Sequence, residues 1–82
     1  MAVIIIKKSD FTQVRALLMG SPFEAIERPI AYGVQFKLPC GINCNVHYSD
    51  KNTEIMKITP QNEQLDLELF QLLEFNLSTF AC

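Results

Sequence analysis

Apolar and polar residues alternate with a period of two in the middle of the chain. In residues 32–38 and 42–48, every second residue is large and apolar and the others are mostly polar. This spacing predicts two strands, each with one covered and one solvent-facing side. The intervening Pro39-Cys40-Gly41 predicts a turn, so we expect the two strands to pair as an antiparallel hairpin.

Three further segments predict strands. Residues 2–6 form a short β-branched run, which is typical of a buried strand. Residues 23–30 are the least regular, and Pro29 marks them as an edge strand or the end of one. A polar turn over residues 49–52 leads into a last strand at residues 53–59, which we expect Pro60 to end.

The segment before Gly20 predicts a helix of about ten residues. Ser9 or Asp10 is placed to cap its start, and we expect Gly20 to end it with a positive φ angle. Its apolar side consists of Phe11, Val14, Leu17 and Leu18.

A second helix closes the chain, beginning within residues 60–64 with Asn62 as its cap. Leu67 and Phe75 fall outside its covered side, among polar residues. They are either ordinary surface side chains or a contact for a second subunit or a partner protein. The covered side is predicted to hold Leu65, Leu69, Leu72, Leu73, Leu77 and Phe80.

The order is therefore strand, helix, four strands, helix, within one domain spanning residues 1–82. We predict an α+β fold: an antiparallel sheet of about five strands with both helices packed on one face. The longest apolar run, residues 2–6, is far too short to span a membrane and lacks the flanks of a signal peptide. With three cysteines, an odd number, we expect free thiols and a cytoplasmic location.

Charge argues against a dedicated nucleic-acid binder, because the net charge is −2. The charges are also unevenly distributed. Residues 58–82 contain four acidic side chains and no Lys or Arg, whereas the rest of the chain is mildly basic.

The polar side of the two central strands is a candidate binding surface. Amide groups there would give a protein or peptide partner specificity without much charge, although a plain solvated face has the same composition. The edges of a small sheet could also accept a strand from a partner. The predicted surface comprises Gln35, Lys37, Asn43, Asn45 and His47.

Cys40, Cys44 and His47 form the one grouping with metal-like spacing, with Asp50 or Cys82 as a fourth ligand. On a regular strand Cys44 and His47 point to opposite faces, so we predict neither a metal site nor a cofactor. His47 could act as an acid or base with Glu54 or Asp50, but nothing in the spacing requires it. We therefore expect no enzymatic activity.

The element order over residues 2–77, and above all residues 32–73, resembles one repeat of the TATA-binding-protein fold. Single repeats of this kind occur at the N-terminus of ribonuclease HIII and in the N-terminal repeats of the RNase LS toxin. The resemblance implies a sheet that contacts nucleic acid or protein, and it transfers no catalytic residue. The polar face here has only Lys37 and His47 as basic groups and no aromatic platform, which weakens the nucleic-acid version.

From these patterns we predict a small non-catalytic interaction domain that binds a protein partner or itself. Nucleic-acid binding through the polar sheet face is the alternative.

Overall fold

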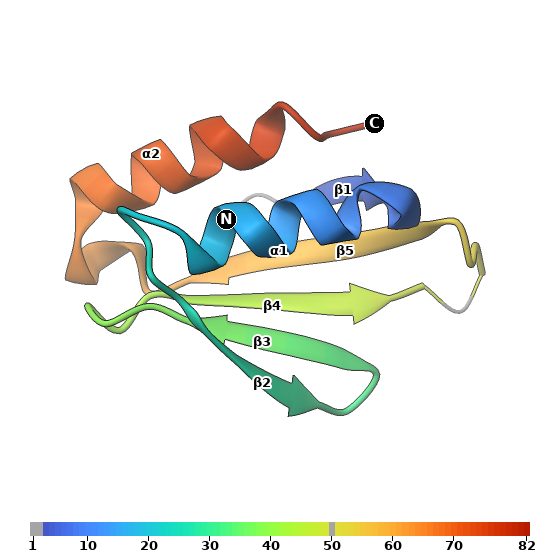
Figure 1. Ribbon diagram of the computed structural model, residues 1–82, viewed down its shortest axis with the longest axis horizontal. Helices are drawn as coiled ribbons and strands as arrows, with labels where there is room; N and C mark the ends of the chain where they lie inside the picture. Colours follow the sequence, from blue (N-terminus) through green and yellow to red (C-terminus); the bar gives the residue numbers. More distant parts are fainter. Residues whose placement is uncertain (1–2, 50) are drawn as a thin grey trace.

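A five-stranded antiparallel sheet forms one layer of the protein, and two helices form the other (Figure 1). The computed structural model describes residues 3–49 and 51–82. The strands lie in the order β1-β5-β4-β3-β2, and the helices are α1 (Phe11–Met19) and α2 (Leu67–Ser78). The predicted fold class and element order are confirmed. The strands are β1 (Ile4–Lys7), β2 (Ile26–Ile30), β3 (Gly33–Lys37), β4 (Asn43–Tyr48) and β5 (Ile55–Gln61).

The register of the sheet decides which side chains meet the helices. Residues directly opposite each other in an antiparallel pair share a face. Ile58 lies between Ile4 and Val46, and all three are buried. Their neighbours along the strands therefore point to the other face, away from both helices. The helices complete the core with Val14, Leu18, Phe70, Leu73 and Leu77.

The turn between β3 and β4 forms at the predicted place. The amide of Gly41 donates to the carbonyl of Leu38 at 2.9 Å. The amide of Leu38 donates to the carbonyl of Ile42, also at 2.9 Å. Gly41 has a φ angle of 102°, a conformation that side-chain-bearing residues rarely adopt. The hairpin of the two central strands is thus confirmed, with glycine at the position that requires it.

The predicted bounds of the first two strands were wrong. The first strand is Ile4–Lys7 rather than residues 2–6, and position 2 lies outside the described residues. The second begins at Ile26, because Phe23 sits in a turn and fills the core at 1% exposure.

The last strand is Ile55–Gln61 rather than residues 53–59, so Pro60 lies inside the strand that it was expected to end. It is paired with Cys44 of β4, and β5 continues to Gln61. On the other side of β5, pairing with β1 stops at Ile58, opposite Ile4. Pro60 therefore has no described strand neighbour on the β1 side. Proline is tolerated at such a position, because no strand there needs a hydrogen bond from its missing N–H.

The ends of α1 differ from the prediction. Gly20 follows the last residue of α1 with a φ angle of −88° and an extended backbone. It therefore does not end the helix in the left-handed conformation that was predicted. A 3-10 turn, Lys8–Asp10, precedes the helix, and neither Ser9 nor Asp10 caps it through its side chain. The helix packs through Val14 and Leu18, with Phe11 and Leu17 at the border of the core.

The start and the rotation of α2 also differ. Asn62 is left-handed (φ 68°), and its Nδ2 donates to the Gly41 carbonyl at 3.2 Å. Leu65 and Leu72, expected on the covered side, are 52% and 42% exposed, whereas Phe70 is buried. The helix begins later than predicted, at Leu67, after a 3-10 turn over Glu63–Leu65.

Asp66 caps α2, which yields a first prediction. Its Oδ1 accepts from the backbone N–H of Leu69 at 3.1 Å. Asp66→Ala removes that acceptor and should cost about 1 kcal/mol of unfolding free energy, or about 4–8 °C in Tm. Thermal unfolding followed by circular dichroism measures the loss. The control Glu63→Ala, in the preceding turn, should change Tm little, and an equal loss there would contradict the assignment of the cap.

Candidate interaction surfaces

The outer face of the sheet, opposite the helices, is the first candidate surface. It joins residues from all five strands, because the register places them side by side. We call it the sheet surface. Its strand positions are Ile5, Lys7, Ile26, Arg28, Ile30, Gly33, Gln35, Lys37, Asn43, Asn45, His47, Ile55, Lys57, Thr59 and Gln61.

The register brings the five predicted polar residues together on this surface. Gln35 lies opposite Asn45, and its Nε2 donates to the Asn45 Oδ1 at 2.9 Å. Lys37 lies opposite Asn43, while His47 lies between Gly33 and Lys57. The centre of the surface is therefore a paired amide group with basic side chains on both sides along the strands.

The sheet surface is more basic than the sequence predicted. The register adds two basic residues to Lys37 and His47. These are Arg28 of β2 and Lys57 of β5, and the side chains of Arg28 and Lys57 are exposed. None of the strand positions named above carries an Asp or Glu. The one acidic residue of β2, Glu27, turns to the helix side, where its carboxylate pairs with Arg15 at 3.0 Å. Sequence reasoning missed Arg28 because the second strand lacked a regular alternation.

Leu67 and Phe75 belong to a different surface, on the helix side of the molecule. They are 54% and 70% exposed, which confirms that neither faces the core. They lie eight residues apart, about 12 Å along the axis of α2. Leu72 is one turn from Phe75, and Glu68 is one turn from Leu72, so these three form an exposed stripe. We call Leu67, Glu68, Leu72 and Phe75 the helix surface.

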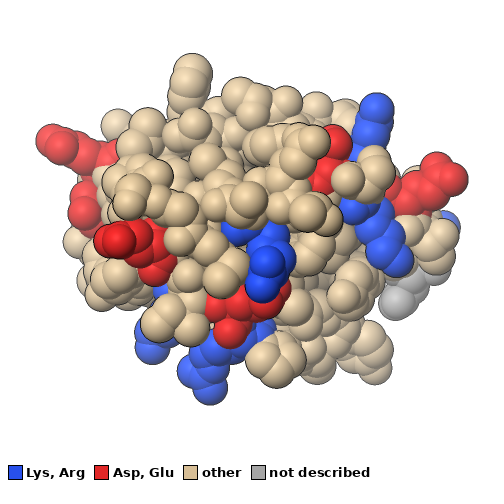
Figure 2. All heavy atoms as spheres, in the orientation of Figure 1, with Lys and Arg blue, Asp and Glu red and all other residues tan. Residues whose placement is uncertain are grey.

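The space-filling view shows the helix side of the molecule. An uncharged area extends along its upper part, where Figure 1 has α2, and acidic side chains gather at the end where α2 begins (Figure 2). The predicted residues thus form two surfaces on opposite sides of the molecule. Leu72 was missed because the sequence placed it on the covered side.

The two edges of the sheet offer little to a partner strand. Ala81 forms a bridge with Ile6, and the amide of Cys82 donates to the Ile5 carbonyl at 3.0 Å, so the chain itself covers part of the β1 edge. The opposite edge is β2, which contains Pro29. Proline has no N–H to donate and discourages pairing at an edge. Strand addition, the other route considered from the sequence, is therefore disfavoured, and the two surfaces are better candidates.

The cysteine and histidine grouping does not converge. Cys44 is fully buried on the helix side, while His47 lies on the sheet surface. Asp50, named as a fourth ligand, lies outside the described residues. Within residues 3–49 and 51–82, no three His, Cys, Asp or Glu side chains come together as metal ligands do. Burial raises the pKa of the Cys44 thiol to about 12, which keeps it protonated and disfavours a metal-binding role.

The raised pKa of Cys44 predicts a loss of stability in alkali. The thiol has an ordinary pKa of 9.0 and one of about 12 when folded. Between these values the unfolded chain ionises and the folded chain does not, so the folded state loses stability as pH rises above 9. The loss approaches about 1.4 kcal/mol per pH unit, hence about 2 kcal/mol by pH 10.5.

Urea unfolding at pH 7, 9 and 10.5 measures this effect. Cys44→Ala should lose less stability than the wild type between pH 9 and 10.5, because the substitution removes only this thiol and changes no other side chain. Cys82→Ala, which changes an exposed thiol, should retain the wild-type slope. Equal slopes in all three proteins would show that Cys44 ionises normally.

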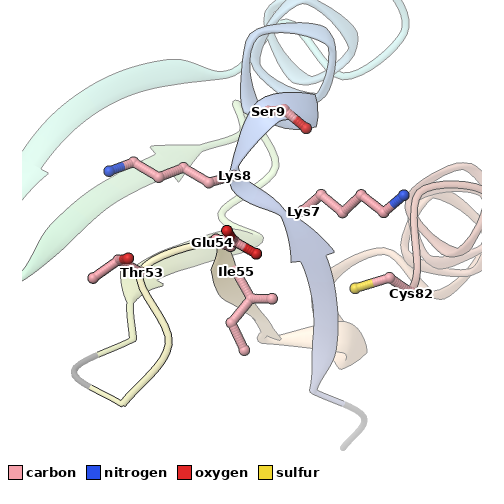
Figure 3. Close-up of a pocket in the computed structure, with 7 residues that line it drawn as sticks. All are labelled: Lys7, Lys8, Ser9, Thr53, Glu54, Ile55 and Cys82. Atoms are coloured by element: carbon pink, nitrogen blue, oxygen red, sulfur yellow. The ribbon is translucent and has the colours of Figure 1, made fainter.

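A hollow of about 680 Å³ lies beside β1 and the β4–β5 loop. Lys7 and Lys8 extend from its rim in opposite directions, with Glu54 between them (Figure 3). The charged groups therefore do not converge on one ligand position. Glu54, considered as a partner for His47, lines this hollow, whereas His47 lines a different one of about 430 Å³. The larger hollow is lined by Lys7, Lys8, Ser9, Thr53, Glu54, Ile55 and Cys82.

No family model, curated protein or solved structure matches this chain. Among the described elements, neither α1 nor α2 has the length and apolar character of a membrane-spanning helix.

Proposed function

We propose that the protein is a small, non-catalytic interaction domain of the TATA-binding-protein type that binds a protein partner, or a second copy of itself, through its sheet surface. One observation carries the proposal. The outer face of a five-stranded sheet is left without a covering layer among the described residues. A broad face assembled from five strands, with both edges discouraged from pairing, favours contact through its side chains.

The composition of the sheet surface supports a protein partner. Exposed isoleucines, such as Ile26 at 67% and Ile5 at 37%, lie among the amides of Gln35 and Asn45. Isoleucine contributes apolar contact area, and amides contribute directional hydrogen bonds. This mixture is typical of protein interfaces. None of the strand positions named for the sheet surface carries an aromatic side chain on which nucleic-acid bases would stack.

Affinity capture with matched charge variants tests the proposal. Wild-type protein, Lys57→Glu on the sheet surface and Lys8→Glu outside it would each be tagged and incubated with nuclease-treated native lysate. We expect a protein retained by the wild type and by Lys8→Glu to be about tenfold depleted with Lys57→Glu, because reversing a contact charge costs about 1.4 kcal/mol. An untagged copy of the chain counts as such a protein.

Two results would contradict the proposal. One is a partner that binds all three proteins equally, since the contact would then lie elsewhere. The other is the absence of any nuclease-resistant partner for the wild type. Circular dichroism of both variants would confirm that the fold is retained.

Nucleic-acid binding is the second candidate, and the one-signed charge of the sheet surface favours it. Arg28, Lys37 and Lys57 could contact phosphates together. Fluorescence anisotropy with labelled single-stranded and duplex oligonucleotides would detect such binding. Affinity that falls steeply with salt and is lost in Lys57→Glu would favour this candidate over a protein partner.

A further inference from the structure

The sheet surface and the segment that forms α2 carry opposite charges. Four acidic residues (Glu63, Asp66, Glu68 and Glu74) lie in the segment that forms α2 and its start, which contains no Lys or Arg. The strand positions of the sheet surface carry lysines and Arg28 but no acidic residue. The sheet surface of one copy is therefore electrostatically complementary to the α2 segment of another copy.

Both surfaces also carry exposed apolar side chains. Phe75 and Leu67 project from α2, and Ile26 and Ile5 lie on the sheet surface. Opposite charge alone would give a weak, salt-screened attraction. Apolar groups on both sides add contact area that salt does not screen.

The dimensions of the two surfaces agree. α2 has 12 residues, which corresponds to a length of about 18 Å. Five strands span about 19 Å from the first to the last. A helix laid across the strands would therefore reach from one side of the sheet surface to the other. Helices already cover the inner face of the same sheet, where they run roughly along the strands (Figure 1), so this contact would add a helical layer to the outer face.

We propose that the sheet surface of one copy receives α2 of a second copy, in a head-to-tail contact between unlike surfaces. This inference rests on the proposed function and names its partner. Because the surfaces lie on opposite sides of the molecule, each contact leaves one free α2 and one free sheet surface at its ends. Such a contact is heterologous, and it adds further copies unless a ring closes.

Sedimentation equilibrium of the wild type gives the first test. We expect the average mass to rise beyond a dimer with increasing concentration at low salt, and to fall towards the monomer in 0.5 M salt. A single 9.3 kDa species from micromolar to millimolar concentration at low salt would overturn the inference.

Two variants with different defects give a sharper test. Lys37→Glu/Lys57→Glu impairs the sheet surface, and Leu67→Ser/Phe75→Ser impairs the helix surface. All four positions are exposed, so we expect both proteins to fold, as checked by thermal unfolding. Each variant alone should be a monomer. Their equimolar mixture should form a one-to-one dimer and nothing larger, because only one intact pair of unlike surfaces remains.

Other outcomes have separate meanings. If Lys37→Glu/Lys57→Glu associates with itself, the contact joins two helix surfaces. If Leu67→Ser/Phe75→Ser associates with itself, the contact joins two sheet surfaces. Either would overturn the head-to-tail arrangement. If every protein is monomeric but Lys57→Glu still loses a nuclease-resistant partner, the inference fails and the proposed function stands.

Discussion

Replacing Gly33 with alanine should destabilise the sheet by about 3 kcal/mol. Gly33 begins β3 and lies opposite His47 of β4. An added Cβ would overlap the carbonyl oxygen of Val46, and it would lie 2.9 Å from the carbonyl carbon and 3.0 Å from the Cα of His47. These are backbone atoms, so the clash is relieved only by separating the two strands.

Urea unfolding of Gly33→Ala, with Gly20→Ala as the control, measures this cost. At Gly20 the nearest atom to an added Cβ is the Ala16 carbonyl oxygen at 3.2 Å, and the backbone conformation is open to any residue. We expect Gly20→Ala to change the unfolding free energy by less than about 1 kcal/mol. Similar values for the two variants would mean that β3 and β4 are not as close at Gly33 as the register requires.

Where apolar and polar residues alternate strictly, the sequence predicted correctly which side chains are buried. Phe36, Cys44 and Val46 are buried where the alternation predicted, because one covered face fixes the orientation of every side chain along a strand. The alternation failed at the ends. Tyr32 and Tyr48 have the parity of the core but are 79% and 49% exposed. Tyr32 lies in the turn before β3 with a φ angle of 61°, outside the regular strand.

The candidate surfaces were harder to predict, because they depend on which strands are neighbours. Gln35, Lys37, Asn43, Asn45 and His47 follow from the hairpin alone, and the structure places all five on one face. Lys57 joins them only because β5 pairs with β4, and Arg28 only because β2 pairs with β3. A charge count along the chain therefore gave a nearly neutral polar face, whereas the register makes it basic.

The rotation of α2 could not be derived from periodicity, because its sequence is apolar on more than one side. Seven of its twelve residues (LELFQLLEFNLS) are Leu or Phe, so several faces satisfy a helical spacing. Asp66 decides the outcome together with the sheet. It fixes the first turn, and the core then accepts Phe70, Leu73 and Leu77.

This rotation makes opposite predictions for two adjacent leucines. Leu73 is fully buried, and Leu73→Ala should cost about 3 kcal/mol, because it leaves a cavity between α2 and the sheet. Leu72 is 42% exposed, and Leu72→Ala should cost less than about 1 kcal/mol. Urea unfolding of both variants measures the difference. Equal losses would restore the rotation expected from the sequence and remove Leu72 from the helix surface. A large loss confined to Leu73 fixes the outward side of α2 as Glu68, Leu72 and Phe75, the side that the head-to-tail contact requires.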